Sequence, residues 1–105
     1  MENKLISVVL PTYNVVRCLE KCLDSLIDQT YSNIEILVVI DGATDGSYEL
    51  AQEYETKDSR IKVIYQENAG SGPARNNGIK HSRGEFIAFV DPDDLANFDN
   101  AIQDN

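Results

Sequence analysis

Residues 34–40 read I-E-I-L-V-V-I, and this almost wholly apolar run, closed by Asp41, decides the fold class of the 105-residue chain. A second run of the same character, L-I-S-V-V-L at residues 5–10, is expected to end at Pro11. Continuous apolar runs of this length are typical of strands that are buried on both faces, as in a parallel sheet. Two further candidate strands lie at residues 61–65 and 86–90.

Three helices are predicted between these strands. Apolar side chains recur at helical spacing over residues 18–27 and form one stripe, while residues 47–57 have a similar inner face. A third and shorter helix is predicted at residues 72–82, where Gly78 lowers its intrinsic stability. The order β-α-β-α-β-α-β predicts an α/β fold with a mainly parallel sheet and helices on both faces.

The composition fits one soluble domain and excludes several classes of function. A net charge of −9 argues against nucleic acid as a partner, because phosphate backbones require basic surfaces. An acidic protein that binds a diphosphate needs a local cation, and a divalent metal is the simplest one. Cys18 and Cys22 lie four residues apart on one predicted helix, where a disulfide is unfavourable, so we expect two reduced, buried cysteines.

The sequence shows no signal peptide and no apolar stretch of the roughly 20 residues that cross a bilayer. We therefore expect a cytoplasmic segment, and a peripheral position at the inner face of the membrane is the expectation for a longer parent protein.

Polar residues follow three of the predicted strands. Residues 11–14 (P-T-Y-N), 41–45 (D-G-A-T-D) and 91–94 (D-P-D-D) each come directly after an apolar run. Open α/β sheets bind their ligands beyond the carboxyl ends of the strands, so these three clusters are expected to share one edge. This convergence is the main functional signal in the sequence.

Asp91, Asp93 and Asp94 place three carboxylates within four residues. A hard divalent ion such as Mg²⁺ or Mn²⁺ prefers one or two carboxylates together with substrate phosphate oxygens. The alternative is a solvated acidic turn in which Asp93 or Asp94 caps a short helix. The position after an apolar strand favours the metal site.

The first two clusters each carry a functional and a purely structural interpretation. The Tyr13 ring can lie against a planar base, and Thr12 and Asn14 offer hydrogen bonds; alternatively the segment is a turn in which Asn14 caps the next helix. Asp41 can accept a hydrogen bond from a base or ribose, or it can be an ordinary Asp-Gly turn residue. Asp45 or Gly46 is expected to cap the second helix.

Four cationic or titratable residues lie on or near the third predicted helix. Arg75 is closest to the helix start and is the best candidate for a pyrophosphate contact. Lys80, His81 and Arg83 are interpreted as a solvated helix face.

Five segments in order carry a family resemblance: S-V-V-L-P-T-Y-N at 7–14, S-L-I-D-Q-T-Y-S-N-I-E-I-L-V-V at 25–39, D-G-A-T-D-G-S at 41–47, N-A-G-S-G-P-A-R-N-N-G-I at 68–79 and G-E-F-I-A-F-V-D-P-D-D at 84–94. Together they resemble the family 2 glycosyltransferases, which have the GT-A fold with its Rossmann-like nucleotide-binding half. The resemblance covers nearly the whole chain. It implies transfer of a sugar from a nucleotide-sugar donor, with a UDP-sugar favoured, and a metal-dependent, inverting reaction in bacterial surface polysaccharide or glycoprotein assembly.

The resemblance also implies roles for individual residues. Pro11, Thr12 and Tyr13 would line the base pocket, and Asp41 would hydrogen-bond the base. Arg75 would lie near the diphosphate. The run from Asp91 to Asp94 is similar to the family's D-x-D element, in which Asp91 and Asp93 would contact the nucleotide and Asp93 and Asp94 would hold Mn²⁺ or Mg²⁺. Which of Asp93 and Asp94 is the direct ligand stays open.

Two departures from the family pattern shape the expected activity. Ile40 stands where a second acidic residue usually precedes Asp41, so weaker or altered donor binding is expected. No residue after Asp94 resembles an acceptor-binding half with its catalytic base. Residues 1–94 are therefore interpreted as the donor domain and residues 95–105 as a short helix or frayed tail at which a longer enzyme is truncated, so the chain alone is expected to be inactive.

Two other classes of function compete with this interpretation. One is a non-catalytic nucleotide-binding or regulatory module. The other is a phospho-receiver domain, which is disfavoured because the polar segment P-T-Y-N at 11–14 stands where that fold has an acidic pair. The acceptor is left open as a glycan, a lipid-linked sugar or a protein.

Overall fold

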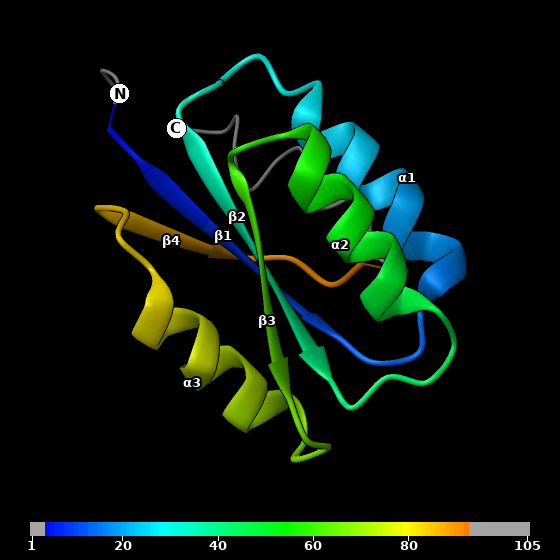
Figure 1. Cartoon of the computed structure of the whole chain (residues 1–105). Coiled ribbons are helices and arrows are strands. Elements are labelled where there is room, and N and C mark those ends of the chain that lie inside the picture. The colour runs from blue at the N-terminus through cyan, green and yellow to red at the C-terminus, as the bar shows by residue number, and fades with distance from the viewer. Residues whose placement is uncertain (1–3, 93–105) are drawn as a thin grey trace.

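The computed structural model describes residues 4–92, which form a four-stranded sheet and three helices (Figure 1). All strand pairs are parallel, and the strand order is β3-β2-β1-β4. The elements are β1 (Ile6–Thr12), α1 (Val16–Ile27), β2 (Ile34–Asp41), α2 (Ser47–Lys57), β3 (Ile61–Gln66), α3 (Ser71–His81) and β4 (Phe86–Phe89). The predicted α/β class and element order are confirmed, and residues 93–105 lie outside the described part.

The two faces of the sheet bury separate apolar clusters. The larger cluster lies under α1 and α2, where Val8, Leu10, Ile36 and Val38 meet the α1 stripe of Leu19, Cys22, Leu23 and Leu26. The smaller cluster lies under α3 and consists of Val9, Leu37, Val39 and Ala74. Successive residues of β1 and β2 thus alternate between the two clusters, which is why both strands read as continuous apolar runs. Figure 1 shows α1 and α2 on one side of the sheet and α3 on the other.

Helix α3 lies unusually close to β1 at Gly78. A Cβ added to Gly78 would lie 2.4 Å from Val9 Cγ1, well inside van der Waals contact. The glycine that weakens this helix in isolation is therefore what allows the helix to approach the sheet. Cys18 and Cys22 are both free, as expected, although only Cys22 is fully buried.

The prediction that Pro11 ends the first strand is wrong, because β1 continues to Thr12. The backbone N–H of Val90 bonds to the carbonyl of Val9, so odd-numbered residues of β1 direct their backbone groups toward β4. The β1–β4 register ends at Val9 and Phe89, so Pro11 faces that side where the ladder has already stopped. The missing N–H of proline therefore costs no ladder hydrogen bond.

Candidate functional site

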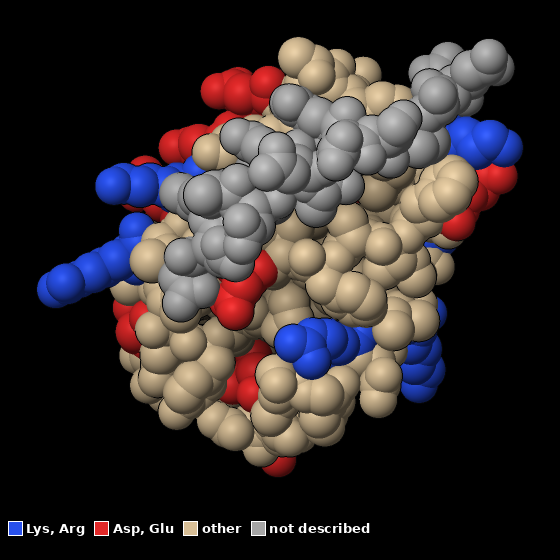
Figure 2. Space-filling model, turned by 180° about the vertical axis from the view of Figure 1, so that it is seen from behind, with Lys and Arg blue, Asp and Glu red and all other residues tan. Residues whose placement is uncertain are grey.

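A pocket of about 360 Å³ opens at the carboxyl edge of the sheet, between the loop after β1, the start of α3 and the end of β4. It brings together every predicted nucleotide-binding residue that the structure describes. These residues are Pro11, Thr12, Tyr13, Asp41, Arg75 and Asp91, and the lining is completed by Val15, Ser71, Ala74, Phe89 and Val90. Acidic and basic side chains also lie close together near the middle of the rear face of the molecule (Figure 2).

The loop after β1 supplies one wall of the pocket. Thr12 is buried, and its hydroxyl donates to the carbonyl of Leu10 at 3.0 Å, so its side chain is held against the strand. Tyr13 is 51% exposed and presents a free aromatic surface to the pocket. Asn14 follows with a φ of 50°, a left-handed conformation that asparagine tolerates better than most residues. The segment can therefore offer a flat ring to a planar ligand.

The carboxylate of Asp41 is 5% exposed and is already bonded within the protein. Its Oδ1 accepts from the backbone N–H of Ala69 at 2.7 Å and from Gln66 Nε2 at 2.9 Å, and its Oδ2 accepts from the N–H of Gly70 at 3.0 Å. Burial acts to raise the pKa of Asp41, but these hydrogen bonds outweigh it and lower the pKa. Asp41 thus holds the loop before α3, and Oδ2 keeps acceptor capacity toward the pocket.

Sequence reasoning missed the side-chain network that extends from Asp41. Gln66 Oε1 accepts from Asn77 Nδ2 at 3.0 Å, so β2, β3 and α3 are joined through three polar side chains. The sequence shows only that Gln66 and Asn77 are polar residues in elements with an otherwise apolar inner side. Their hydrogen-bond partners are distant in sequence, so no local sequence pattern predicts these bonds.

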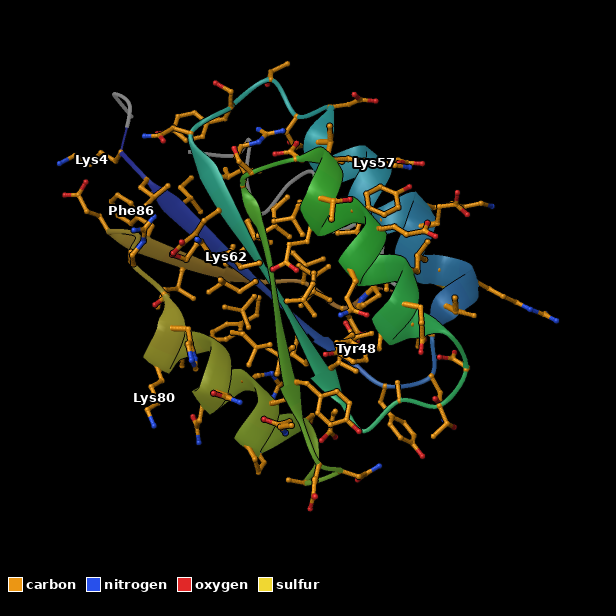
Figure 3. All side chains as sticks on the ribbon, viewed as in Figure 1. Lys4, Tyr48, Lys57, Lys62, Lys80 and Phe86 are labelled. Carbon is orange, nitrogen blue, oxygen red and sulfur yellow. The ribbon has the colours of Figure 1, made fainter. Side chains whose placement is uncertain are left out.

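The first turn of α3 forms another part of the pocket wall. Ser71, Ala74 and Arg75 line the pocket, and Arg75 is exposed at its rim. Lys80 extends away from the sheet (Figure 3), and Lys80 and His81 are exposed on α3, in agreement with the expected solvated face. The prediction is wrong for Arg83, which is exposed but lies beyond the end of α3 and pairs its Nε with Glu35 Oε1 at 3.6 Å. Arg75 is therefore the cation of α3 that lies at the pocket.

Ile40 is fully buried and belongs to the cluster under α1 and α2, whereas Asp41 faces the loop before α3. Ile40 is not among the residues that line the pocket. The expectation of weaker or altered donor binding stays a prediction.

The prediction that Asn14 caps α1 is wrong. Its Oδ1 accepts from the backbone N–H of Thr44 at 2.8 Å, which lies in the loop after β2. The N–H of Val16, at the start of α1, instead donates to Asp45 Oδ2 at 3.0 Å. Asp45 Oδ1 accepts from both the N–H and the hydroxyl of Ser47, so the predicted contribution of Asp45 to the start of α2 is observed.

The end of β4 places Asp91 at the pocket, and Asp91 is exposed. Asp93 and Asp94, the predicted metal residues, lie outside the described residues. Within residues 4–92, no group of three or more His, Cys, Asp or Glu side chains is arranged to hold a metal ion. An oxygen ligand from a carboxylate such as Asp91 suits a hard divalent cation, which would complete its coordination shell with phosphate oxygens.

Comparison with known proteins agrees with this fold. The family model described as glycosyl transferase family 2 matches residues 7–104. The chain is 52% identical over 90 residues to the uncharacterized glycosyltransferase EpsJ of Bacillus subtilis (strain 168), covering 86% of this chain. The chain belongs to glycosyl transferase family 2.

Two solved structures superpose well on the chain. One is S. aureus TarS 1-349 in complex with UDP-GlcNAc, with a TM-score of 0.79, 32% identity and coverage of 93% of this chain and 30% of that one. The other is the mannosyltransferase PcManGT from Pyrobaculum calidifontis in complex with GDP-Man and Mn²⁺, with a TM-score of 0.76, 25% identity and coverage of 93% and 31%.

The chain spans only 26% of the length of EpsJ, and 30% and 31% of the TarS and PcManGT chains. Among residues 4–92, none of the helices combines the length and the apolar composition that a bilayer-spanning helix needs.

Proposed function

We propose that this chain forms the donor site of a glycosyltransferase and binds a nucleotide sugar, with UDP-sugars favoured. The observation that carries the proposal is one pocket that gathers an aromatic ring, a buried acceptor, a cation and an exposed carboxylate: Tyr13, Asp41, Arg75 and Asp91. The relatives support the class of ligand, since TarS was solved with UDP-GlcNAc and PcManGT with GDP-Man. The acceptor is an unassigned glycan, lipid-linked sugar or protein.

Each wall of the pocket suits one part of a nucleoside diphosphate. Tyr13 stacks on the base, because its half-exposed ring is a flat apolar surface in the lining of the pocket. Asp41 Oδ2 accepts a hydrogen bond from the base, while its other bonds hold the loop before α3 in place. Arg75 and the N-terminus of α3 lie together and complement the negative charge of the diphosphate.

The acidic segment after β4 is proposed to complete the site. Asp91 and Asp93 contact the nucleotide, and Asp93 and Asp94 hold Mn²⁺ or Mg²⁺. A bound divalent ion supplies neutralisation of the charge that develops on the departing diphosphate. The protein residues orient the donor so that an acceptor hydroxyl can approach the anomeric carbon from the side opposite the departing diphosphate. This approach inverts the configuration at the anomeric carbon. An inverting transfer also needs a carboxylate base within hydrogen-bond reach of that hydroxyl.

Titration calorimetry with UDP tests this proposal directly. We expect binding in Mn²⁺ or Mg²⁺ and at least about tenfold weaker binding after chelation with EDTA, a loss on the scale of one charge-assisted contact. Replacing Asp93 and Asp94 with asparagine should abolish the metal dependence while the far-UV circular dichroism stays unchanged. Equal UDP affinity with and without EDTA, or normal metal–UDP binding by the double variant, contradicts the metal assignment.

A further inference from the structure

The loops after β1 and β2 are joined by two hydrogen bonds that cross between them in opposite directions. Asn14 Oδ1 accepts from the N–H of Thr44 at 2.8 Å, and Asp45 Oδ2 accepts from the N–H of Val16 at 3.0 Å. Each loop thus supplies one side-chain acceptor and one backbone donor. We call this pair of contacts the loop brace.

Tyr13 depends on this brace more than the pocket residues Asp41 and Thr12 do. Asp41 is buried and bonded to three N–H donors, and Thr12 belongs to β1, so both are held by the core of the fold. Tyr13 is 51% exposed, so packing against neighbours restrains its ring only in part. Its position is set by the backbone on either side, which is β1 before it and the brace residue Asn14 after it.

Asp45 holds the end of the β1–α1 loop at Val16, the first residue of α1. One of its carboxylate oxygens bonds the N–H of Val16, and the other bonds the N–H and hydroxyl of Ser47 at 3.0 and 2.6 Å. A single carboxylate therefore satisfies backbone donors at the start of both α1 and α2, where helices leave such groups unpaired and carry positive partial charge. This ties the start of α1 to the start of α2, and leaves the segment between β1 and α1 little freedom.

From this geometry we infer that Asn14 and Asp45 are positioning residues, which hold the Tyr13 ring against the base of a bound nucleotide without contacting the nucleotide themselves. The inference rests on the proposed donor site. It goes beyond that proposal by assigning base affinity partly to two residues that do not line the pocket. It also assigns them no part in binding the phosphates, which lie toward Arg75.

The left-handed backbone at Asn14 allows a clean test. Asn14→Gly removes the Oδ1 acceptor and keeps a residue that adopts a φ of 50° without strain, whereas Asn14→Asp keeps the acceptor. Asp45→Ala removes the other half of the brace. Asp58→Ala is the matched control, because Asp58 also accepts the N–H two residues ahead, that of Arg60 at 2.9 Å, but lies before β3 at the other edge of the sheet.

The variants are titrated with uridine, UDP and pyrophosphate in the presence of Mn²⁺, using the full 105-residue chain. Asn14→Gly and Asp45→Ala should weaken uridine and UDP binding about threefold to tenfold, the effect of one lost hydrogen bond, and leave pyrophosphate binding unchanged. Asn14→Asp should restore the affinity, and Asp58→Ala should not change it. In a Tyr13→Ala background, Asn14→Gly should have no further effect, because the ring it positions is gone.

A second measurement does not depend on any ligand. Amide hydrogen exchange should show the N–H of Thr44 and Val16 protected in the wild type and released in Asn14→Gly and Asp45→Ala respectively. Unprotected amides in the wild type, or unchanged uridine affinity in both brace variants, overturns the inference. Absence of UDP binding by the wild type with both amides protected refutes the donor-site proposal and, with it, the role assigned to the brace.

Discussion

Replacing Gly78 with alanine sets helix propensity against packing, and the structure indicates that packing is the larger effect. In an exposed helix this change stabilises by about 1 kcal/mol. In this fold the added Cβ would lie 2.4 Å from Val9 Cγ1, 3.1 Å from Cγ2 and 3.3 Å from Cβ. Val9 is fully buried, which restricts rotation of its side chain, and rotation would leave its Cβ at 3.3 Å, so we expect α3 to separate from β1.

The size of the effect follows from these distances. Ordinary contact between carbon atoms begins at about 3.5 Å, so α3 moves outward by up to about 1 Å when Val9 keeps its side-chain conformation. Overpacking of this kind costs about 1–3 kcal/mol, and subtracting the gain in helix propensity leaves a net loss of about 1 kcal/mol in the free energy of unfolding. For a domain of this size that loss lowers Tm by about 4–8 °C.

Urea and thermal unfolding, followed by far-UV circular dichroism, measure this loss. Gly72→Ala is the matched control in the same helix, because a Cβ at Gly72 meets no other atom within 4 Å and should leave stability unchanged or slightly raised. Val9→Ala combined with Gly78→Ala should be more stable than the sum of the two single changes predicts. A Gly78→Ala protein as stable as the wild type would refute the close approach of α3 to β1.

Three further predictions concern charged residues. Burial opposes ionisation of Glu35, but hydrogen bonds, the Ser7 hydroxyl first among them, lower its pKa below 4.5. Stability that depends on this group is therefore present above pH 4.5 and lost as the pH falls through the lowered pKa, and Glu35→Gln should flatten that acid limb in urea titrations. Asp41→Asn is isosteric but turns an amide N–H toward an N–H donor such as that of Gly70. The free energy of unfolding should therefore fall by about 1–3 kcal/mol. Unchanged stability in urea unfolding would contradict the hydrogen bonds of Asp41. Arg75→Gln should weaken UDP binding about tenfold or more in calorimetry and leave uridine binding unchanged, and equal losses for both ligands would argue against a diphosphate contact.

The elements of the fold were predictable because their signals are local. Strands buried on both faces need apolar residues at every position, and residues 34–40 meet that requirement in the sequence itself. The pocket opens where it was expected for a related reason, since the carboxyl ends of parallel strands share one edge and therefore bring Tyr13, Asp41 and Asp91 together.

The errors arose where a residue's role depends on a distant part of the chain. Pro11 reads as a strand terminator, but β1 runs past it because the neighbouring ladder of β4 has already ended. Asn14 reads as a helix cap, but its side chain accepts a hydrogen bond from the N–H of Thr44 in another loop. Gly78 reads as a weak point in a helix, and only contact with Val9 shows that the helix needs it.

The sequence by itself determined the class of fold, the order of its elements and the edge at which a ligand would bind, since hydrophobic periodicity records burial residue by residue. Only the tertiary structure decided which donors meet which acceptors. The carboxylates of Asp41 and Asp45 could each have bonded a ligand, a nearby turn or a remote backbone N–H, and local sequence carries no record of which donors folding brings within 3 Å.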